Sequence, residues 1–377
     1  MSDPLAWINA ESAAWTARGL RRALRPADPE RINFASNDYL GLASDPRLVH
    51  AAMEAATRYG WGSGASPLVS GWTEAHESLA RDLATFEQTE AALLFPTGYA
   101  ANVGALTALV GKPDVIYSDA LNHACLIDGA RLSGATIRIY HHKEVDALAS
   151  LLKADANQFR RSMIITDGVF SMDGDLAPLD RIAELGEEHG AMLLVDEAHG
   201  TGVFGRDGRG AASELGVADR VTIKVGTLSK ALGSVGGFVA GSARLIDWLT
   251  NHARSLIFST AAPAATVAAA GEALRIVGAE PERRARARAL GDRLRTALRE
   301  LGFSVVAATG PIVPVVVGDP NEAMALSARL AARGFHVPAI RPPTVPEGTA
   351  RLRVCVSAAH SDADLDALIL AFREAGA

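Results

Sequence analysis

The sequence predicts an α/β protein with a mostly parallel sheet in a large domain and a smaller α+β domain at its C-terminal end. Between about residues 46 and 275, short apolar runs alternate with amphipathic stretches of helical spacing, which is typical of a doubly wound parallel sheet. From about Pro281, long helical patterns and short strands replace this alternation. A chain of 377 residues can also bury a large core, and one large plus one smaller domain is its natural division.

The first part of the chain divides into an arm and the large domain. Residues 1–45 are expected to form an N-terminal arm, with a helix from Trp7 to Leu24 and a short strand near Ile32. The large domain is expected to cover residues 46–277, with helices such as Leu179 to His189 between many of its strands. Its expected strands are 91–95, 115–117, 136–140, 163–166, 192–195, 221–225 and 238–240.

The small domain is expected to cover residues 278–377. Its pattern predicts three helices and four strands. In chain order these are a helix at 281–301, strands at 303–306 and 312–317, a helix at 321–333, strands at 336–340 and 352–356, and a helix at 361–374.

Composition excludes several classes of protein. The net charge is −6, which gives no reason to expect a nucleic-acid or membrane partner, and the basic run 283–288 is expected to be a solvated helix face. The two cysteines, Cys125 and Cys355, have no metal-type spacing, so we expect reduced thiols in a cytoplasmic protein and no metal site. The N-terminal residues lack the apolar core of a signal peptide, and no apolar run is long enough to span a bilayer.

Three polar residues follow apolar runs of the large domain. These residues are Asp167, Asp196 and Thr227. Ligands bind beyond the carboxyl ends of the strands in open parallel sheets. If the three strands are parallel, their polar ends gather at one edge of the sheet.

Lys230 lies in a glycine-rich turn, 225–237, directly after one of these runs. Small and hydroxyl-bearing neighbours would leave the lysine amine accessible, so that it could form a Schiff base. A surface lysine is the simpler interpretation. Asp196 and His199 follow the preceding run. A carboxylate can keep a pyridine nitrogen protonated and a histidine can bond a phenolic oxygen, but a helix cap and a structural histidine are the alternatives.

Two further sites are weaker when each is taken alone. Residues 95–102 have the pattern of a strand end, a tight turn at Gly98 and a helix start, where free N–H groups suit a phosphate. An ordinary strand–turn–helix connection is about as good an interpretation. His123 could stack on a flat ring, or it could have only a structural role.

Taken together, these segments resemble the pyridoxal-phosphate-dependent α-oxoamine synthases, fold-type I enzymes of aminotransferase class II. The resemblance covers nearly the whole chain and is carried by residues 33–42, 168–175 and the lysine segment. Within the family, residues 196–202 and 339–353 are most similar to the member that condenses L-alanine with a pimeloyl thioester, on coenzyme A or acyl carrier protein, in biotin biosynthesis. A glycine-using sister synthase, an aminotransferase and a non-catalytic protein of the same fold are the alternatives.

The resemblance implies a role for each matching residue. Lys230 would hold pyridoxal phosphate, Asp196 would pair with its ring nitrogen, His199 would contact its phenolic oxygen, and His123 would stack on the ring. The phosphate would be bound by Gly98, Tyr99 and Thr227, with Ser171 near the cofactor. The amino-acid carboxylate would meet Arg353 and Asn37, and Arg21 and Thr344 would line the acyl-substrate side.

The resemblance also implies a homodimer, and it exposes two departures from the family pattern. Asp167 stands where relatives often have Glu, so any contact made by this carboxylate would be shorter in reach. Pro67 lies in the glycine-rich loop 63–71 and is not the commonest residue there.

Overall fold

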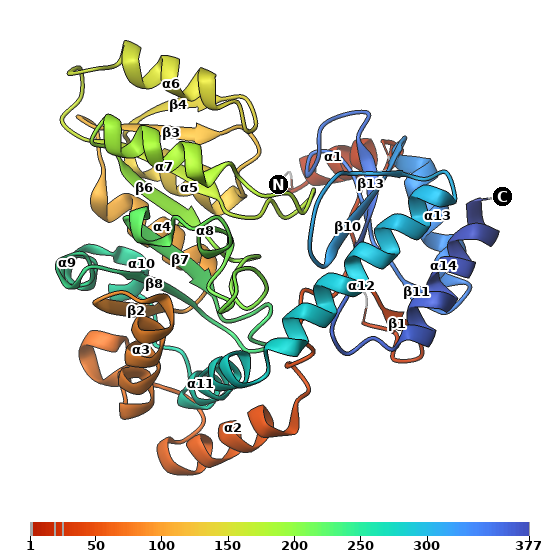
Figure 1. Cartoon of the computed structure of the whole chain (residues 1–377), viewed down its shortest axis with the longest axis horizontal. Helices are drawn as coiled ribbons and strands as arrows, with labels where there is room; N and C mark the ends of the chain where they lie inside the picture. Colours follow the sequence, from red (N-terminus) through yellow and green to blue (C-terminus); the bar gives the residue numbers. More distant parts are fainter. Residues whose placement is uncertain (1–2, 19, 25, 377) are drawn as a thin grey trace. The chain divides into compact units, whose positions relative to one another are not determined.

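The computed structural model describes residues 3–18, 20–24 and 26–376. It contains two compact units, shown in Figure 1. The larger unit comprises residues 37–171 and 175–288, and the smaller one comprises residues up to Ser36 together with 172–174 and 289–377. The expected division into an arm, a large domain and a small domain, at residues 45 and 277, stays a prediction.

The larger unit is built on a seven-stranded sheet with the strand order β2-β8-β7-β6-β5-β3-β4. Its strands are β2 (Ala91–Phe95), β3 (Val115–Asp119), β4 (Thr136–Tyr140), β5 (Ser162–Asp167), β6 (Met192–Asp196), β7 (Ile223–Thr227) and β8 (Gly237–Gly241). Strand β8 runs antiparallel to both of its neighbours, and the pairs from β7 to β4 are all parallel. The expected mostly parallel sheet is therefore confirmed.

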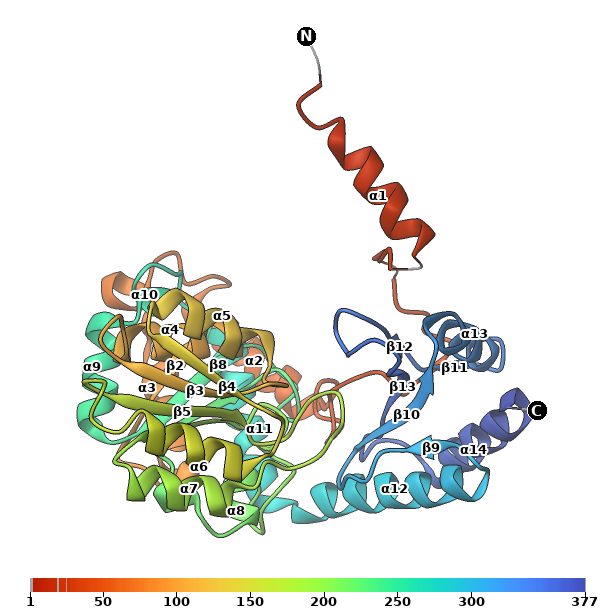
Figure 2. The ribbon, with the colours of Figure 1, turned by 90° about the horizontal axis from the view of Figure 1, so that it is seen from above.

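Helices cover both faces of this sheet. Figure 2 shows α4 and α5 on one side and α6 and α7 on the other. The helices of the unit are α2 (Pro46–Tyr59), α3 (Glu74–Glu87), α4 (Gly98–Leu109), α5 (Ala124–Ser133), α6 (Val145–Ala154), α7 (Leu179–Glu188), α8 (Ala211–Glu214), α9 (Ala243–His252), α10 (Arg254–Ile257) and α11 (Ala264–Ala279). Two short turns complete it, a π-helix at Pro67–Gly71 and a 3-10 helix at Ala218–Arg220.

The strands near the centre of the sheet form because their sequences are apolar on both faces. Strand β6 reads Met-Leu-Leu-Val-Asp, and its last four residues are buried, as expected for a parallel strand covered by helices. Leu194 on β6 packs with Leu106 of α4 and Leu126 of α5 in one core. Burial of the apolar residues leaves the single polar residue, Asp196, at the strand's carboxyl end.

The smaller unit has a four-stranded antiparallel sheet, in the order β12-β13-β10-β9, and a two-stranded parallel one formed by β1 and β11. Its strands are β1 (Ile32–Asn33), β9 (Ser304–Val305), β10 (Ile312–Gly318), β11 (Phe335–His336), β12 (Ala339–Ile340) and β13 (Ala350–Cys355). Its helices are α1 (Trp7–Ala17), α13 (Pro320–Ala331) and α14 (Asp362–Gly376), and α12 (Pro281–Glu300) begins in the larger unit. The helices α12 and α14 pack on the four-stranded sheet through a core that includes Leu294, Val313, Leu352 and Phe372.

Three expectations about local structure are wrong. The helix predicted for Trp7 to Leu24 ends at Ala17, shortly before Gly19 in the sequence, and glycine lowers helix stability by about 1 kcal/mol relative to alanine. The strand predicted at 336–340 is split into β11 and β12 around Pro338, which has no N–H group to donate.

The third error concerns the basic run at the start of α12. Arg284 is only 9% exposed, and its guanidinium donates to the carbonyl oxygens of Val277 (2.8 Å) and Arg206 (2.6 Å). Arg283 and Arg288 also pair with acidic side chains. The run is therefore an anchored part of the larger unit, because helix C-terminal and loop carbonyls bind the guanidinium groups.

Within residues 3–18, 20–24 and 26–376, none of the helices combines the length and the apolar character that crossing a membrane requires.

Candidate active site

Three strands of the larger unit end together in polar residues. Strands β5, β6 and β7 are adjacent and parallel, and the register pairs Asp167 with Asp196 and Asp196 with Val225. Thr227 follows two residues after Val225 and ends β7. The expected gathering of Asp167, Asp196 and Thr227 at the carboxyl edge of the sheet is confirmed.

Asp196 is buried and held by two elements. Its side chain is 3% exposed. Oδ1 accepts the N–H of Ala198 (2.8 Å), and Oδ2 accepts the side-chain amide of Asn102 on α4 (2.7 Å). The thiol of Cys125 also donates to Oδ2, at 3.7 Å, and burial followed by the charge of Asp196 raises the pKa of that thiol. The carboxylate thus has one fixed orientation.

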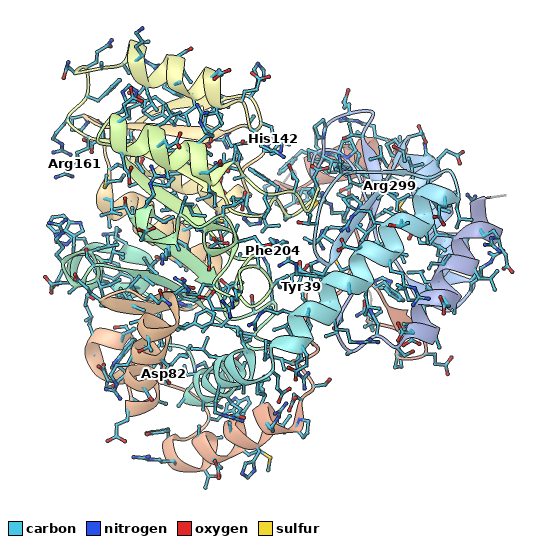
Figure 3. The ribbon with its side chains drawn as sticks, in the orientation of Figure 1. Tyr39, Asp82, His142, Arg161, Phe204 and Arg299 are labelled. Carbon is cyan, nitrogen blue, oxygen red and sulfur yellow. The ribbon has the colours of Figure 1, made fainter. Side chains whose placement is uncertain are left out.

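Lys230 and His199 are in direct contact. The Lys230 Nζ atom lies 2.8 Å from His199 Nε2. The other ring nitrogen, Nδ1, lies 2.7 Å from the hydroxyl of Tyr39, which in turn donates to Asn37 Oδ1 at 3.0 Å. Tyr39, labelled in Figure 3, is fully buried, and Lys230 is half-buried. An amine with this degree of exposure can be reached by a small carbonyl compound.

His123 and Asp167 form a second contact at the same sheet edge. His123 caps the start of α5, and its backbone N–H donates to Asp167 Oδ2 at 2.7 Å. Asp167 is buried, and this burial, reinforced by the nearby charge of Asp196, raises its pKa well above the usual range. Asp167 therefore orients the turn that carries His123.

The turn at Gly98 brings β7 and α4 close together. Thr97 caps α4 by accepting the N–H of Ala100 at 3.0 Å. A Cβ atom on Gly98 would lie 3.3 Å from both the Cβ and Oγ1 atoms of Thr227, a tight contact. Thr227 Oγ1 lies 2.8 Å from Ser229 Oγ. Free N–H groups and hydroxyls at the start of a twelve-residue helix suit an anion.

The remaining predicted residues are spread over both units. Tyr99 is 47% exposed, and its hydroxyl donates to Asp128 at 2.7 Å. Ser171 lies half-buried in the segment between β5 and α7. The smaller unit carries Arg353 on β13, Thr344 and Arg21.

The three residues of the smaller unit differ in their surroundings. Arg353 is 5% exposed, and its guanidinium donates to Cys355 Sγ at 2.9 Å. Thr344 accepts a hydrogen bond from Arg22 at 2.9 Å, whereas Arg21 is exposed. Arg22, and not the predicted Arg21, is thus the arginine seen to contact Thr344.

Two residues that touch the site were missed from the sequence, Tyr39 and Asn102. Both lie inside segments that the sequence analysis singles out. Asn102 follows Gly98 by four residues, so both lie on one side of α4. That spacing could have placed the amide next to the strand ends, whereas nothing in the local pattern relates Tyr39 to His199, which follows it by 160 residues.

This arrangement defines a class of enzyme. A reachable lysine amine can condense with an aldehyde, a buried carboxylate can pair with a protonated ring nitrogen, and the start of α4 can bind a phosphate. Among the described residues, no group of three or more His, Cys, Asp or Glu side chains could hold a metal ion. The fold is that of a fold-type I pyridoxal-phosphate enzyme.

Comparisons with known proteins identify the family. The model of the aminotransferase class I and II family matches residues 29–372. The 8-amino-7-oxononanoate synthase of Anaeromyxobacter sp. strain Fw109-5 is 54% identical over 382 residues, which cover 98% of this chain and 96% of that protein. The enzyme of the same name from Anaeromyxobacter dehalogenans strain 2CP-1 is 50% identical over 378 residues, covering 97% and 94%.

Solved structures agree on the fold. Serine palmitoyltransferase from Sphingomonas wittichii has a TM-score of 0.93 and 33% identity, and covers 100% of this chain and 98% of that one. The 8-amino-7-oxononanoate synthase of Francisella tularensis has a TM-score of 0.80 and 29% identity, covering 92% and 98%. The chain belongs to the 8-amino-7-oxononanoate synthases, acyltransferases of biotin biosynthesis within the class I and II aminotransferases.

Pyridoxal phosphate is the cofactor of this family, and the residues present fit it. The donor set contains an amine at Lys230, a buried carboxylate at Asp196 and a glycine turn at which a Cβ atom would make a tight contact with Thr227. Asn102 Oδ1 is buried without a hydrogen-bond partner among the described residues, although the same side chain fixes Asp196 through its nitrogen. These groups complement the aldehyde, ring nitrogen and phosphate of the cofactor.

Proposed function

We propose that the chain condenses L-alanine with a pimeloyl thioester, on coenzyme A or acyl carrier protein, to give 8-amino-7-oxononanoate, CO2 and the free thiol. The observation that carries this proposal is the contact of the Lys230 amine with His199, beside the buried carboxylate of Asp196. The names and identities of the Anaeromyxobacter relatives support the choice of product. The reaction balances, because one C–C bond forms, the thiol leaves and the alanine carboxylate departs as CO2.

Lys230 is proposed as both the cofactor anchor and the proton carrier. Bound pyridoxal phosphate supplies an aldehyde for the amine and a protonated ring that withdraws electron density. Lys230 Nζ, once displaced by the amino group of alanine, would remove the Cα proton and later return one to the same carbon. His199 Nε2, 2.8 Å from Nζ, is suited to contact the phenolic oxygen beside that amine.

Asp196 and His123 are proposed to contact the ring of the cofactor. The Asp196 carboxylate would keep a proton on the ring nitrogen, supported by its burial and its bond from Asn102. His123 would stack on the ring, supported by its fixed position at the start of α5 next to Asp167. The Asp196 carboxylate would thus stabilise the positive charge on the ring nitrogen during the reaction.

The start of α4 is proposed to bind the phosphate. The backbone N–H groups of Gly98 and Tyr99 and the hydroxyl of Thr227 would donate to it, and Ser171 would lie near the cofactor. The close approach of Gly98 to Thr227 supports this arrangement, because helix N-termini favour anions.

Four further residues are proposed to bind the two substrates. Arg353 would bind the alanine carboxylate through its planar guanidinium, with Asn37 nearby. Arg21 and Thr344 would line the acyl side, and the bond from Arg22 to Thr344 supports a polar environment there.

A screen of substrate pairs tests the proposed reaction. We expect L-alanine with pimeloyl-CoA or pimeloyl-acyl carrier protein to give the highest kcat/KM for thiol release, with one CO2 per thiol. Glycine with acetyl-CoA or succinyl-CoA should be at least about 10-fold poorer, since one methyl group in an apolar site is worth roughly 10- to 200-fold. L-Serine with palmitoyl-CoA is a third arm, because a serine palmitoyltransferase matches the whole chain.

Each other outcome of the screen has a defined meaning. A preference for a glycine pair would make the chain a sister synthase, and transfer of the amino group without thiol release would make it an aminotransferase. No turnover with any pair, by protein that binds the cofactor, would support a non-catalytic protein of this fold.

We also propose that the chain is a homodimer. Large apolar side chains between residues 49 and 69 of the larger unit are exposed, including Trp61 (80%) and Val69 (78%), and exposed apolar side chains close in sequence favour an interface. A molar mass in solution near twice the 39.4 kDa of one chain is expected by light scattering. The mass of a single chain at micromolar concentration would contradict the proposal.

The proposed location is the cytoplasm. Both cysteines are free and buried, which supports a reducing compartment.

A further inference from the structure

His142 lies between two buried carboxylates of the larger unit. This half-buried histidine, labelled in Figure 3, follows β4. Its Nδ1 atom lies 3.0 Å from Asp119 Oδ1, and its Nε2 atom lies 3.1 Å from Asp175 Oδ2. A neutral imidazole carries one N–H group, so it could donate to only one of the two carboxylates. Both contacts are favourable when the ring is an imidazolium, which has two N–H donors.

The first carboxylate, Asp119, shapes the turn that leads to His123. Asp119 ends β3, and its Oδ1 atom accepts the N–H group of Leu121 at 2.8 Å, which closes a tight turn two residues before His123. Its Oδ2 atom accepts the N–H group of Lys143 at 2.9 Å. The carboxylate thus joins the turn to the segment that follows β4.

The second carboxylate, Asp175, belongs to a hairpin that contains Ser171. The two ends of this hairpin, 169–176, pair with each other, and the carbonyl oxygen of Asp175 accepts the N–H group of Phe170 at 3.0 Å. The Phe170 ring packs edge-on against the His142 ring, with 4.3 Å between their centroids. His142 therefore contacts the hairpin through both a carboxylate and an aromatic ring.

The charges around His142 balance when the ring is protonated. Lys143 Nζ donates to Asp175 Oδ2 at 2.7 Å, so two cations then meet two carboxylates. Burial lowers the pKa of His142, but hydrogen bonds to Asp119 and Asp175 outweigh burial and raise the pKa to about 9. Burial raises the pKa of Asp175, but hydrogen bonds from His142 and Lys143 lower it further, so the carboxylate is ionised. Tyr140, which lies near Asp119, has its pKa raised by burial and is neutral.

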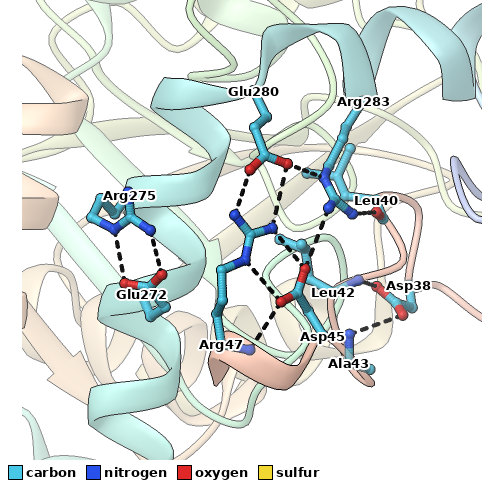
Figure 4. A network of polar contacts seen from close by, with 10 residues as sticks. All are labelled: Asp38, Leu40, Leu42, Ala43, Asp45, Arg47, Glu272, Arg275, Glu280 and Arg283. Carbon is cyan, nitrogen blue, oxygen red and sulfur yellow. Dashed lines mark hydrogen bonds and ion pairs between the residues drawn. The ribbon is translucent and has the colours of Figure 1, made fainter. Parts of the chain in front are cut away.

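Another pair of carboxylates in the same unit is bridged by an arginine instead. Figure 4 shows Arg283 between Asp45, at 3.3 Å, and Glu280, at 2.6 Å. A guanidinium stays charged at every pH at which proteins fold. A bridge through His142, by contrast, loses its charge as the pH rises through about 9.

We propose that His142 is a positioning residue, which as an imidazolium bridges Asp119 and Asp175 and so fixes the turn before His123 to the hairpin that carries Ser171. The role rests on the proposed function, in which His123 and Ser171 lie at the cofactor. A neutral ring would leave one carboxylate facing a nitrogen lone pair, so the bridge would open. Because folding raises the pKa of His142 from 6.5, the bridge contributes fully below pH 6.5 and is lost as the pH rises through about 9.

Nitrogen-15 NMR of histidine-labelled protein tests the charge of the ring without any measurement of activity. The His142 signal is the one that is absent from both His142→Gln and His142→Lys. We expect the imidazolium pattern near neutral pH and its loss as the pH rises through about 9. A neutral His142 ring at neutral pH would overturn the proposal.

Hydrogen exchange followed by mass spectrometry locates the effect of the bridge. We expect His142→Gln to speed exchange at least about 10-fold in residues 119–123 and 169–176, as for a lost hydrogen bond to a charged group, with no change in β6. In the wild-type protein, the same two segments should loosen relative to β6 when the pH is raised above about 9. Unchanged exchange in both segments, or an equal increase in β6, would contradict a local bridge.

Kinetics of the loaded enzyme separate positioning from general stability. His142→Gln should lower kcat roughly 10- to 100-fold, with KM for L-alanine changed less than about 3-fold, because small displacements of reacting groups slow chemistry. The ratio of wild-type to variant kcat should shrink above about pH 9, where the wild-type ring is neutral too. His142→Lys, which keeps a cation, should retain more activity. The matched control is His50→Gln, which removes an exposed histidine 3.2 Å from Glu54 and should behave as wild type.

The two proposals fail in different ways. A wild-type protein with no activity on alanine pairs contradicts the proposed function, while NMR and hydrogen exchange still decide whether the bridge exists. A His142→Gln variant with wild-type kcat contradicts the positioning role alone.

Discussion

Replacing Lys230 with alanine is expected to abolish product formation, with a loss of roughly 10³- to 10⁶-fold in kcat, as is usual when an enzyme loses its covalent nucleophile. The physical reason is that the variant lacks the amine that would hold the cofactor and carry the Cα proton. Thiol release from pimeloyl-CoA with L-alanine measures the loss. Borohydride reduction followed by mass spectrometry should add the cofactor mass to the wild-type chain and not to the variant.

Two further variants separate the amine from its charge and from general effects of mutation. Lys230→Arg keeps a positive charge near His199 but offers no amine that can condense with an aldehyde, so it should be as inactive as the alanine variant. Lys153→Ala, which removes an exposed lysine at the end of α6, should behave as wild type. Turnover of Lys230→Ala at a rate near wild type would make the assignment of Lys230 wrong.

The functional residues at the strand ends could be predicted from the sequence, because each strand changes from apolar to polar residues at its carboxyl end. In β6, four apolar residues precede Asp196, so the end of the strand and its functional carboxylate are read from the same pattern. The parallel register of β5, β6 and β7 then places Asp167 beside Asp196. Local patterns thus predict where the functional residues lie along the chain. The strand order then places these residues at one edge of the sheet.

Contacts that depend on tertiary structure could not be predicted in this way. Arg284 lies in a run that has the composition of a solvated helix face, yet its guanidinium is buried because the carbonyls of Val277 and Arg206 bind it. Tyr39 contacts His199, which lies 160 residues further along the chain, and the Leu40 carbonyl beside Tyr39 is bound by Arg283 of α12. Neither relation leaves a periodic signal, since the partners come from distant parts of the chain.

The second large effect is expected for Asp196→Asn. The amide keeps the shape of the side chain but removes the negative charge that would hold a proton on the cofactor ring, so removal of the alanine Cα proton should slow roughly 10²- to 10⁴-fold. Exchange of that proton for deuterium, followed by proton NMR with L-alanine alone, measures this step. Cofactor affinity should change less, because Lys230 and the start of α4 remain intact.

Asp167→Asn is the matched control for this charge effect. Asp167 lies beside Asp196 in the register of β5 and β6, but burial and the charge of Asp196 raise its pKa, which favours the neutral carboxyl. An asparagine there loses little charge and keeps an oxygen for the N–H of His123, so exchange should slow less than about 10-fold. Equal losses in the two variants, or wild-type exchange in Asp196→Asn, would contradict a special electrostatic role for Asp196, because the two carboxyls are equally buried, at 3% exposure each.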